Sequence, residues 1–402
     1  MKKLIILFSI AFIFNFCKKE EEVDDVPDVP ISWTKTFGGT DWDVGSSVQQ
    51  TTDGGYIITG SITSFGNGSE DVYLIKTDGN GDSLWTKTFG GTGWDVGSSV
   101  QQTTDGGYII TGGVESFGNG NDDVYLIKTD QSGNELWSKT FGGVDGEGGS
   151  SVQQTNDGGY IIAGSTSSFG NWSDLYLIKT DGSGNEQWFK IFGGTYLDVG
   201  ESVQQTNDGG YIITGVTNSF GNGSEEVLLI KTDGNGDSLW TKTFGGTDWE
   251  EDWGNSVQQT NDGGYIITGW THPDPTPGSF EDSEVLLIKT DGSGNEEWTK
   301  TFGGADGESG SSVQQTNDGG YIIAGSTSSF GNGNEDVYLI KTDGSGNEQW
   351  FKTFGGVDGE SGSSVQQTND GGYIIAGSTS SFGNGGSDIY LIKTDENGNI
   401  SQ

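Results

Sequence analysis

The chain repeats one phrase of seven residues, W-x-K-x-F-G-G, seven times along its 402 residues. The copies are spaced 52, 52, 51, 52, 58 and 52 residues apart and begin at Trp33, Trp85, Trp137, Trp188, Trp240, Trp298 and Trp350. The phrases S-V-Q-Q-T, D-G-G-Y-I-I and L-I-K-T-D follow in every period. Self-similarity at a fixed period indicates an array of structural units that each bury an apolar face against a neighbour.

Each period contains four short apolar segments separated by Gly, Asn and Asp clusters, which are strand and turn signals. In the first complete period the expected strands are residues 47–51, 56–60, 72–77 and 84–89, named A to D in chain order. Strands B and C carry β-branched and aromatic residues on both faces, so we expect both faces to be buried. Four strands repeated seven times predict an all-β fold, a seven-bladed β-propeller.

The two ends of the array predict how the propeller, residues 31–402, closes. Trp33 belongs to a strand D with no preceding A, B or C, whereas the last period supplies A, B and C and stops at Gln402. Pairing residues 31–37 with residues 389–394 would complete the last blade and leave no open sheet edge. This split favours a closed ring over an open solenoid.

The N-terminal segment predicts export. Residues 1–16 combine two lysines with an apolar run too short to span a bilayer, which needs about 20 residues, and they are expected to be a signal peptide. Cys17 is the one cysteine of the chain and follows this run directly, so we expect it to be lipidated. The alternative is a thiol beside an uncleaved anchor. Residues 17–30 are acidic and are expected to form a lipid-anchored tether at the outer membrane or cell surface.

Two motifs carry a family resemblance. G-G-x-x-x-D-x-G stands before strand A, and D-x-x-G-x-x-x-W, as in Asp181, Gly184 and Trp188, joins strand C to strand D. Over residues 31–402 they resemble the β-propeller repeats of bacterial secreted and surface proteins. The second motif is also similar to the tryptophan-docking motif of quinoprotein propellers, one residue shorter. The surroundings of Cys17 resemble a bacterial lipoprotein signal followed by an acidic export tag of the Bacteroidetes type. The resemblance implies a surface lipoprotein with repeats of about 52 residues.

Charge limits the partners. The chain has 58 acidic residues against 18 lysines and no arginine, a net charge of −40, and every lysine beyond the N-terminus lies in W-x-K or L-I-K. Such a surface repels phosphates and anionic headgroups, so we expect no nucleic acid partner and membrane contact only through the lipid anchor. We expect a monomer with a protein or glycan ligand.

Catalytic residues are scarce. The chain has one His and one Cys, so a nucleophile with a His base is not expected, and we predict that the protein is not an enzyme. His272 lies in a Pro-rich insertion and is expected to be a surface loop residue. A glycosidase that uses carboxylates alone stays open, because the repeats supply many acids. No cofactor is firmly implied.

A carboxylate stands five residues before the strand A Val in every repeat. Strand A lines the channel of a propeller, so seven acids would ring one channel mouth, where Ca²⁺ is the expected cation. The alternative is that each carboxylate caps its own turn by accepting backbone N–H groups. The seven are Asp43, Asp95, Glu147, Asp198, Asp252, Glu308 and Glu360.

Aromatic residues vary between blades on the same predicted face, which holds the D to A and B to C loops. Trp42, Trp94, Tyr196, Trp249 and Trp253 are expected in D to A loops, and Trp172 and Trp270 in B to C loops. Exposed aromatic residues above a rigid scaffold indicate recognition. We therefore expect an extracytoplasmic, lipid-anchored binding or scaffold protein that uses this acidic, aromatic-rich face. The alternative is a carbohydrate-active propeller, either a lectin-like module or a carboxylate-dependent lyase or hydrolase.

Overall fold

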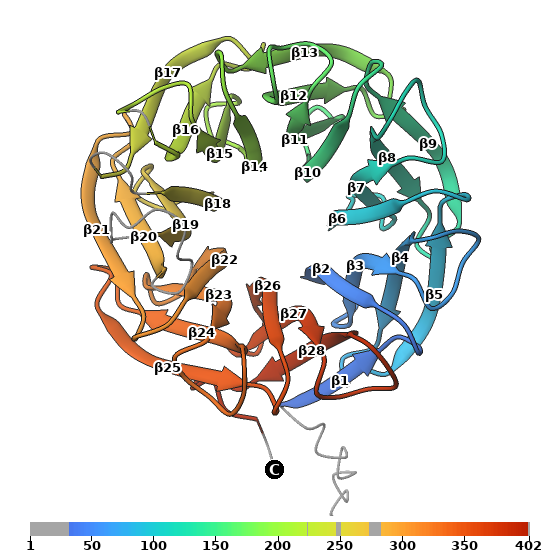
Figure 1. Cartoon of the computed structure of the whole chain (residues 1–402), viewed down its shortest axis with the longest axis vertical. Helices are drawn as coiled ribbons and strands as arrows, with labels where there is room; N and C mark the ends of the chain where they lie inside the picture. Colours follow the sequence, from blue (N-terminus) through green and yellow to red (C-terminus); the bar gives the residue numbers. More distant parts are fainter. Residues whose placement is uncertain (1–31, 223, 247–250, 273–282, 401–402) are drawn as a thin grey trace, which may run out of the picture. The chain divides into compact units, whose positions relative to one another are not determined.

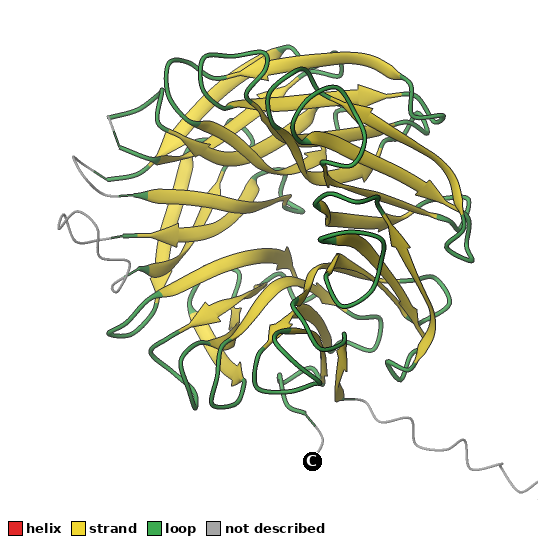
Figure 2. Cartoon of the chain, turned by 45° about the vertical axis from the view of Figure 1, so that its right-hand side comes forward, coloured by secondary structure: helices red, strands yellow, loops and turns green. Residues whose placement is uncertain are grey.

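A computed structural model describes residues 32–222, 224–246, 251–272 and 283–400. These residues form strands joined by loops (Figure 2). The A strands are β2 (Asp43–Gln50), β6 (Asp95–Gln102), β10 (Glu147–Gln154), β14 (Asp198–Gln205), β18 (Asp252–Gln259), β22 (Glu308–Gln315) and β26 (Glu360–Gln367). The B strands are β3 (Tyr56–Ile62), β7 (Tyr108–Val114), β11 (Tyr160–Thr166), β15 (Tyr211–Thr217), β19 (Tyr265–Thr271), β23 (Tyr321–Thr327) and β27 (Tyr373–Thr379).

The C strands follow on the outer side of the B strands. They are β4 (Asp71–Thr77), β8 (Asp123–Thr129), β12 (Asp174–Thr180), β16 (Glu226–Thr232), β20 (Glu284–Thr290), β24 (Asp336–Thr342) and β28 (Asp388–Thr394). The D strands are β5 (Ser83–Phe89), β9 (Glu135–Phe141), β13 (Glu186–Phe192), β17 (Ser238–Phe244), β21 (Glu296–Phe302), β25 (Glu348–Phe354) and β1 (Trp33–Phe37).

The strands form seven antiparallel sheets of four, the blades of a propeller. Blade 1 is β2 to β5, the next five blades continue in chain order, and blade 7 joins β26, β27 and β28 to β1. Figure 1 shows the A strands innermost and the D strands outermost in a ring. The predicted seven-bladed, all-β propeller is confirmed.

Ring closure occurs through the predicted pair of segments. Strand β1 pairs antiparallel with β28, with Trp33 opposite Lys393 and Phe37 opposite Ile389. In Figure 1 the blue β1 lies beside the red β28. The N-terminal strand therefore completes the last blade and leaves β28 without an open edge.

Strands B and C are buried on both faces, as their residue pattern predicted; in blade 1, every residue of β3 and β4 is buried. Strand A starts four residues earlier than predicted, at Asp43 instead of residue 47. A register shift between Gly45 and Ser47 interrupts the pairing with β3, and the strand continues on both sides of it. Such bulges insert a residue without ending a strand.

Consecutive blades share hydrophobic cores. The core between blades 7 and 1, for example, combines Ile58 and Ile75 of blade 1 with Ile389 and Leu391 of blade 7. The D strand tryptophan of one blade also packs on the next blade: the Trp33 ring lies against Tyr56, with ring centroids 5.8 Å apart. The same Trp–Tyr contact recurs around the ring.

Side-chain acceptors on each A strand also tie neighbouring blades together. The Ser47 hydroxyl accepts the Val100 amide at 3.3 Å, and the Gln49 carbonyl oxygen accepts the Gln102 amide at 2.6 Å. The Gln102 side chain in turn accepts the Thr52 amide of the preceding blade at 2.9 Å. These three contacts repeat at the other blade junctions, including that between blades 7 and 1. The S-V-Q-Q-T segment, a joint phrase of the repeat, therefore forms part of strand A and also links neighbouring blades.

Candidate ligand-binding face

The D to A and B to C loops lie on the same side of the blades, and we call their described residues the loop face. Within blade 1, the Thr63 amide donates to the Trp42 carbonyl at 3.1 Å and the Asp41 amide donates to the Ser64 hydroxyl at 3.0 Å. Between blades, the Asp43 amide donates to the Ser387 carbonyl of blade 7 at 2.7 Å. The loop face comprises the described residues of 38–42, 90–94, 142–146, 193–197, 245–251, 303–307 and 355–359, and of 63–70, 115–122, 167–173, 218–225, 272–283, 328–335 and 380–387.

The seven carboxylates at the start of the A strands are buried, with 0 to 3% of each residue exposed. Asp43 accepts the amides of Gly39 at 2.6 Å, Thr63 at 3.0 Å and Ser64 at 3.1 Å. It thus joins the D to A loop of its blade to the B to C loop. The oxygens of Asp43 accept backbone amides, and this geometry favours the turn-capping alternative over a free ring of carboxylates at the channel mouth.

Asp95, Glu147, Asp198, Asp252, Glu308 and Glu360 repeat the bond to a glycine amide of the D to A loop. Within the described part of the chain, no cluster of three or more His, Cys, Asp or Glu side chains is placed to hold a metal ion. Calcium binding stays a prediction.

A second set of acids, not predicted from the sequence, caps the B to C loops of six blades from the first residue of strand C. Asp71 accepts the Asn67 amide at 2.7 Å. Burial raises the pKa of Asp123, and the neighbouring carboxylate of Glu147 raises it further. The signal was present, since an acid stands six residues before the Thr of every L-I-K-T: Asp71, Asp123, Asp174, Glu226, Glu284, Asp336 and Asp388.

Exposed apolar side chains gather on the loop face. Trp42, Trp94 and Tyr196 are 66%, 61% and 58% exposed, as their predicted loop positions imply. Of the sixteen large hydrophobic residues exposed among the described residues, eleven lie on the loop face and five on the outer D strands. The eleven are Trp42, Phe65, Trp94, Phe117, Val144, Phe169, Trp172, Tyr196, Phe220, Val357 and Phe382.

Blade 5 departs from the predicted arrangement. Trp253 and Trp270 lie on strands β18 and β19 rather than in loops, directly opposite one another, and their rings stack 5.8 Å apart. The Trp253 indole N–H donates to Glu225 at 2.6 Å. His272 is buried instead of exposed on the surface, because β19 runs up to it and its amide donates to the Glu251 carbonyl at 2.9 Å. Trp249 lies outside the described residues.

A pocket of about 330 Å³ opens between blades 2 and 3 at the loop face. Its walls include Trp94, Asp122 and the hydroxyls of Ser98 and Ser165. Burial raises the pKa of the Asp122 carboxyl, and Glu115 and Asp95 raise it further. Among the described residues, the Asp122 carboxylate and these two hydroxyls make no hydrogen bond, so they are available to a ligand.

Small residues create this pocket. Gly148 stands opposite Ser165 in blade 3, and a Cβ at Gly148 would meet no atom within 4 Å. In blade 6 the equivalent residues are Ser309 and Ser326, whose hydroxyls lie 3.1 Å apart in a hydrogen bond. In blade 5 they are the stacked Trp253 and Trp270. The pocket could not be predicted from the sequence, because its signal is the lack of a side chain at Gly148.

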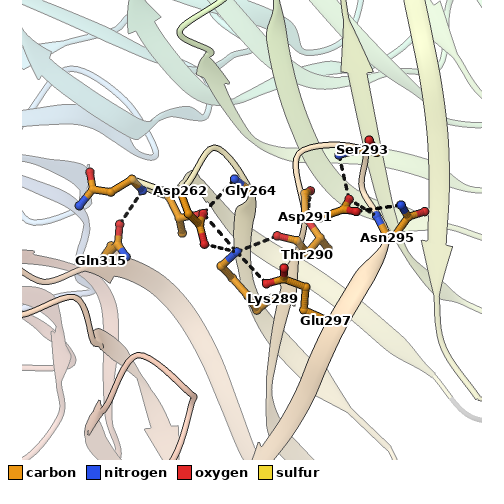
Figure 3. Close-up of polar contacts among 11 residues, drawn as sticks. Asp262, Gly264, Lys289, Thr290, Asp291, Ser293, Asn295, Glu297 and Gln315 are labelled. Atoms are coloured by element: carbon orange, nitrogen blue, oxygen red, sulfur yellow. Dashed lines mark hydrogen bonds and ion pairs between the residues drawn. The ribbon is translucent and has the colours of Figure 1, made fainter.

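The opposite face, built from the A to B and C to D turns, is uniform. In blade 5 the buried Lys289 ammonium contacts Asp262 at 3.0 Å and donates to the Thr290 carbonyl at 2.8 Å (Figure 3). Burial raises the pKa of Asp262, but hydrogen bonds from Thr260, Gly264 and Lys289 outweigh it and lower the pKa to about 2. None of the exposed large hydrophobic residues in the described ranges lies in these turns.

Comparisons with known proteins place the chain by fold. No family model matches it. It is similar to the Regulatory protein FlaEY of Caulobacter vibrioides, with 27% identity over 152 residues, 31% of this chain and 16% of that protein. The chain thus spans about a sixth of the length of this curated relative.

Solved propellers give the broader likeness. Sqt1 from Chaetomium thermophilum has a TM-score of 0.50 at 10% identity, covering 86% of this chain and 82% of that chain. The Pan2 WD40 domain of Neurospora crassa has a TM-score of 0.50 at 11% identity, with 89% and 90% covered. YCF48 bound to D1 peptide has a TM-score of 0.50 at 10% identity, with 92% and 99% covered. At such identities the likeness establishes the fold alone: a β-propeller with repeated blades.

Proposed function

We propose that this protein is an extracytoplasmic, lipid-anchored binding protein that holds its ligand on the loop face. The observation that carries the proposal is the pattern of divergence among its own seven repeats. The core and joint phrases are nearly identical in every blade, whereas the second residue of strand A is Val44, Val96, Gly148, Val199, Trp253, Ser309 and Ser361 in turn. Divergence and exposed aromatic residues coincide on one face, as recognition loops above a rigid scaffold require.

The chemistry of the pocket between blades 2 and 3 favours a neutral sugar unit as the ligand. The exposed indole of Trp94 offers a flat apolar surface, and Asp122, Ser98 and Ser165 offer one acceptor and two hydroxyls. A few polar groups in a mostly apolar hollow are typical of small-molecule sites. Hydrolysis of a glycoside uses two carboxylates, and the second acid at this pocket, Glu147, accepts backbone amides and is committed to its turn. We therefore favour binding over catalysis.

Binding to a glycan array, followed by calorimetry with the strongest ligand, tests the proposal. Trp94→Ala removes the stacking surface, and Gly148→Trp fills the pocket as Trp253 does in blade 5. Both variants should lower the affinity at least tenfold, about 1.4 kcal/mol. Trp42→Ala is the matched control, because Trp42 occupies the equivalent exposed position on blade 1, outside the pocket.

Two results would count against this function: no glycan bound by the wild type, or equal affinities for the wild type and both pocket variants. Export and anchoring rest on the N-terminal signal, and Cys17 lies outside the described residues. Incorporation of labelled palmitate, and its loss in Cys17→Ser, tests the anchor separately. The described part of the chain contains no helix able to cross a membrane.

A further inference from the structure

We propose a second ligand site, in the central channel, where a ring of seven glutamine amides binds a small anion such as a halide or sulfate. This site is independent of the loop face. It is formed by the most uniform part of the repeat, so its ligand would lie on the axis of the ring.

One Val and one Gln from each A strand line a hollow in the central channel, and we call these residues the belt. The hollow inside this belt measures about 230 Å³. At about 30 Å³ per water molecule, it holds a polyatomic anion or a halide with bridging water. The seven glutamines are Gln49, Gln101, Gln153, Gln204, Gln258, Gln314 and Gln366.

Hydrogen bonds between blades fix the orientation of every one of these amides. A backbone N–H can donate only to the carbonyl oxygen of a side-chain amide, never to its NH₂ group. The Gln102 amide donates to the Gln49 oxygen at 2.6 Å, and the Gln50 amide donates to the Gln366 oxygen at 2.6 Å. The other five junctions repeat this bond at 2.5 or 2.6 Å.

The oxygen atoms of the ring are therefore used, and the NH₂ groups are not. None of the seven NH₂ groups makes a hydrogen bond within the described residues, although the same side chains line the hollow. With two N–H donors on each amide, the belt presents a set of donors without acceptors of its own. Such a lining attracts electron-rich ligands and repels cations, and it therefore selects an anion.

Charge near the belt fits this assignment. The residues of the belt are all uncharged, and the acidic exterior is screened over a Debye length of about 8 Å at physiological salt. Glu201 is the fourth residue of β14. The other six A strands carry an uncharged residue at this position, Ser in five blades and Asn in one. Glu201 lies three residues from Gln204, about 10 Å along an extended strand. A carboxylate there weakens an anion site without abolishing it.

The line width of ³⁵Cl⁻ in the presence of the purified full-length chain tests the proposal. The wild type should broaden the chloride resonance, and added sulfate should compete and narrow it. Gln49→Glu combined with Gln204→Glu keeps both inter-blade acceptors and replaces two NH₂ groups by carboxylate oxygens. This variant should lose at least tenfold in chloride affinity at pH 7, while its thermal midpoint in low salt confirms that it folds.

Glu201→Ser, which restores the residue of five other blades, should tighten chloride binding several-fold. A bromide soak of crystals should place the anomalous peak on the ring axis within the belt. The proposal is overturned if the wild type does not broaden the resonance, if the double Glu variant broadens it equally, or if bromide lies only beside surface lysines.

Discussion

At the residue scale, a single glycine in the C to D turn couples two blades. Gly184 adopts a φ of +74°, and a Cβ there would lie 2.5 Å from the Trp137 ring of the preceding blade. Glycine is therefore required at position 184 for two reasons. It adopts a left-handed backbone conformation, and its lack of a Cβ leaves room for the Trp137 indole. Gly158, in the A to B turn of blade 3, has a similar φ of +83° but no atom within 4 Å of its Cβ position.

Alanine substitutions at Gly158 and Gly184 separate the cost of backbone strain from the cost of a clash with the Trp137 ring. Gly158→Ala should lower stability by about 1 kcal/mol, the cost of left-handed backbone for Ala. Gly184→Ala adds a clash with a packed indole and should cost about 1–3 kcal/mol more. Urea unfolding followed by tryptophan fluorescence measures both. If both substitutions lower the free energy of unfolding equally, the Trp137 indole moves aside without cost and its packing against Gly184 does not contribute to stability.

At the element scale, the A to B turn is stabilised by a buried ammonium. Lys179 is 3% exposed, and its ammonium donates to the Thr180 carbonyl at 2.7 Å and contacts Asp157 at 3.0 Å. The D-G-G-Y phrase predicts this hairpin, because Gly supplies the positive φ. The burial of the lysine was not predictable from the phrase, since it depends on strand C lying against the turn.

The bonds to Asp157 in this turn predict that the protein becomes less stable in acid. Burial raises the pKa of Asp157, but bonds from Thr155, Gly159 and Lys179 outweigh it and lower the pKa to about 2. Because the folded pKa lies below the ordinary value of 3.8, this stabilisation is present above about pH 4 and is lost as the pH falls towards 2. The thermal midpoint should fall over that window.

Asp157→Asn is the control for the acid prediction. It should be less stable than the wild type at pH 7, and the difference in thermal midpoint should narrow as the pH falls to 2, where about half of the wild-type carboxyl is protonated. The acids of the B to C loops have the opposite effect on how stability depends on pH. Burial raises the pKa of Asp123, Asp174 and Asp336, so the stability that these groups contribute when protonated is lost as the pH rises. A midpoint that rises on acidification would show that this second set dominates.

At the scale of the whole molecule, the period of the sequence predicted the blade count, the strand order and the closing strand. These properties depend on local strand and turn signals and on counting repeats. Side-chain pairs between strands A and B of one blade were less accessible: Trp253 and Trp270 were expected in loops, yet they stack on neighbouring strands, and the pocket depends on Gly148 lying opposite Ser165. Which side chains face one another depends on the register of strands A and B, which a bulge shifts within each blade.

Closure of the ring depends on strand β1. Strand β1 supplies the outer strand of blade 7, and Trp33, 8% exposed, packs on Tyr56 of blade 1. A chain that begins at Gly38 loses both contacts and exposes the edge of β28. Loss of a buried Trp alone costs about 3–5 kcal/mol, so the truncated chain should melt at a markedly lower temperature and aggregate. A chain that begins at Ser32 keeps β1 and should match the full-length chain. Calorimetry with light scattering distinguishes them, and a monomer from Gly38 with an unchanged melting temperature would refute closure by β1.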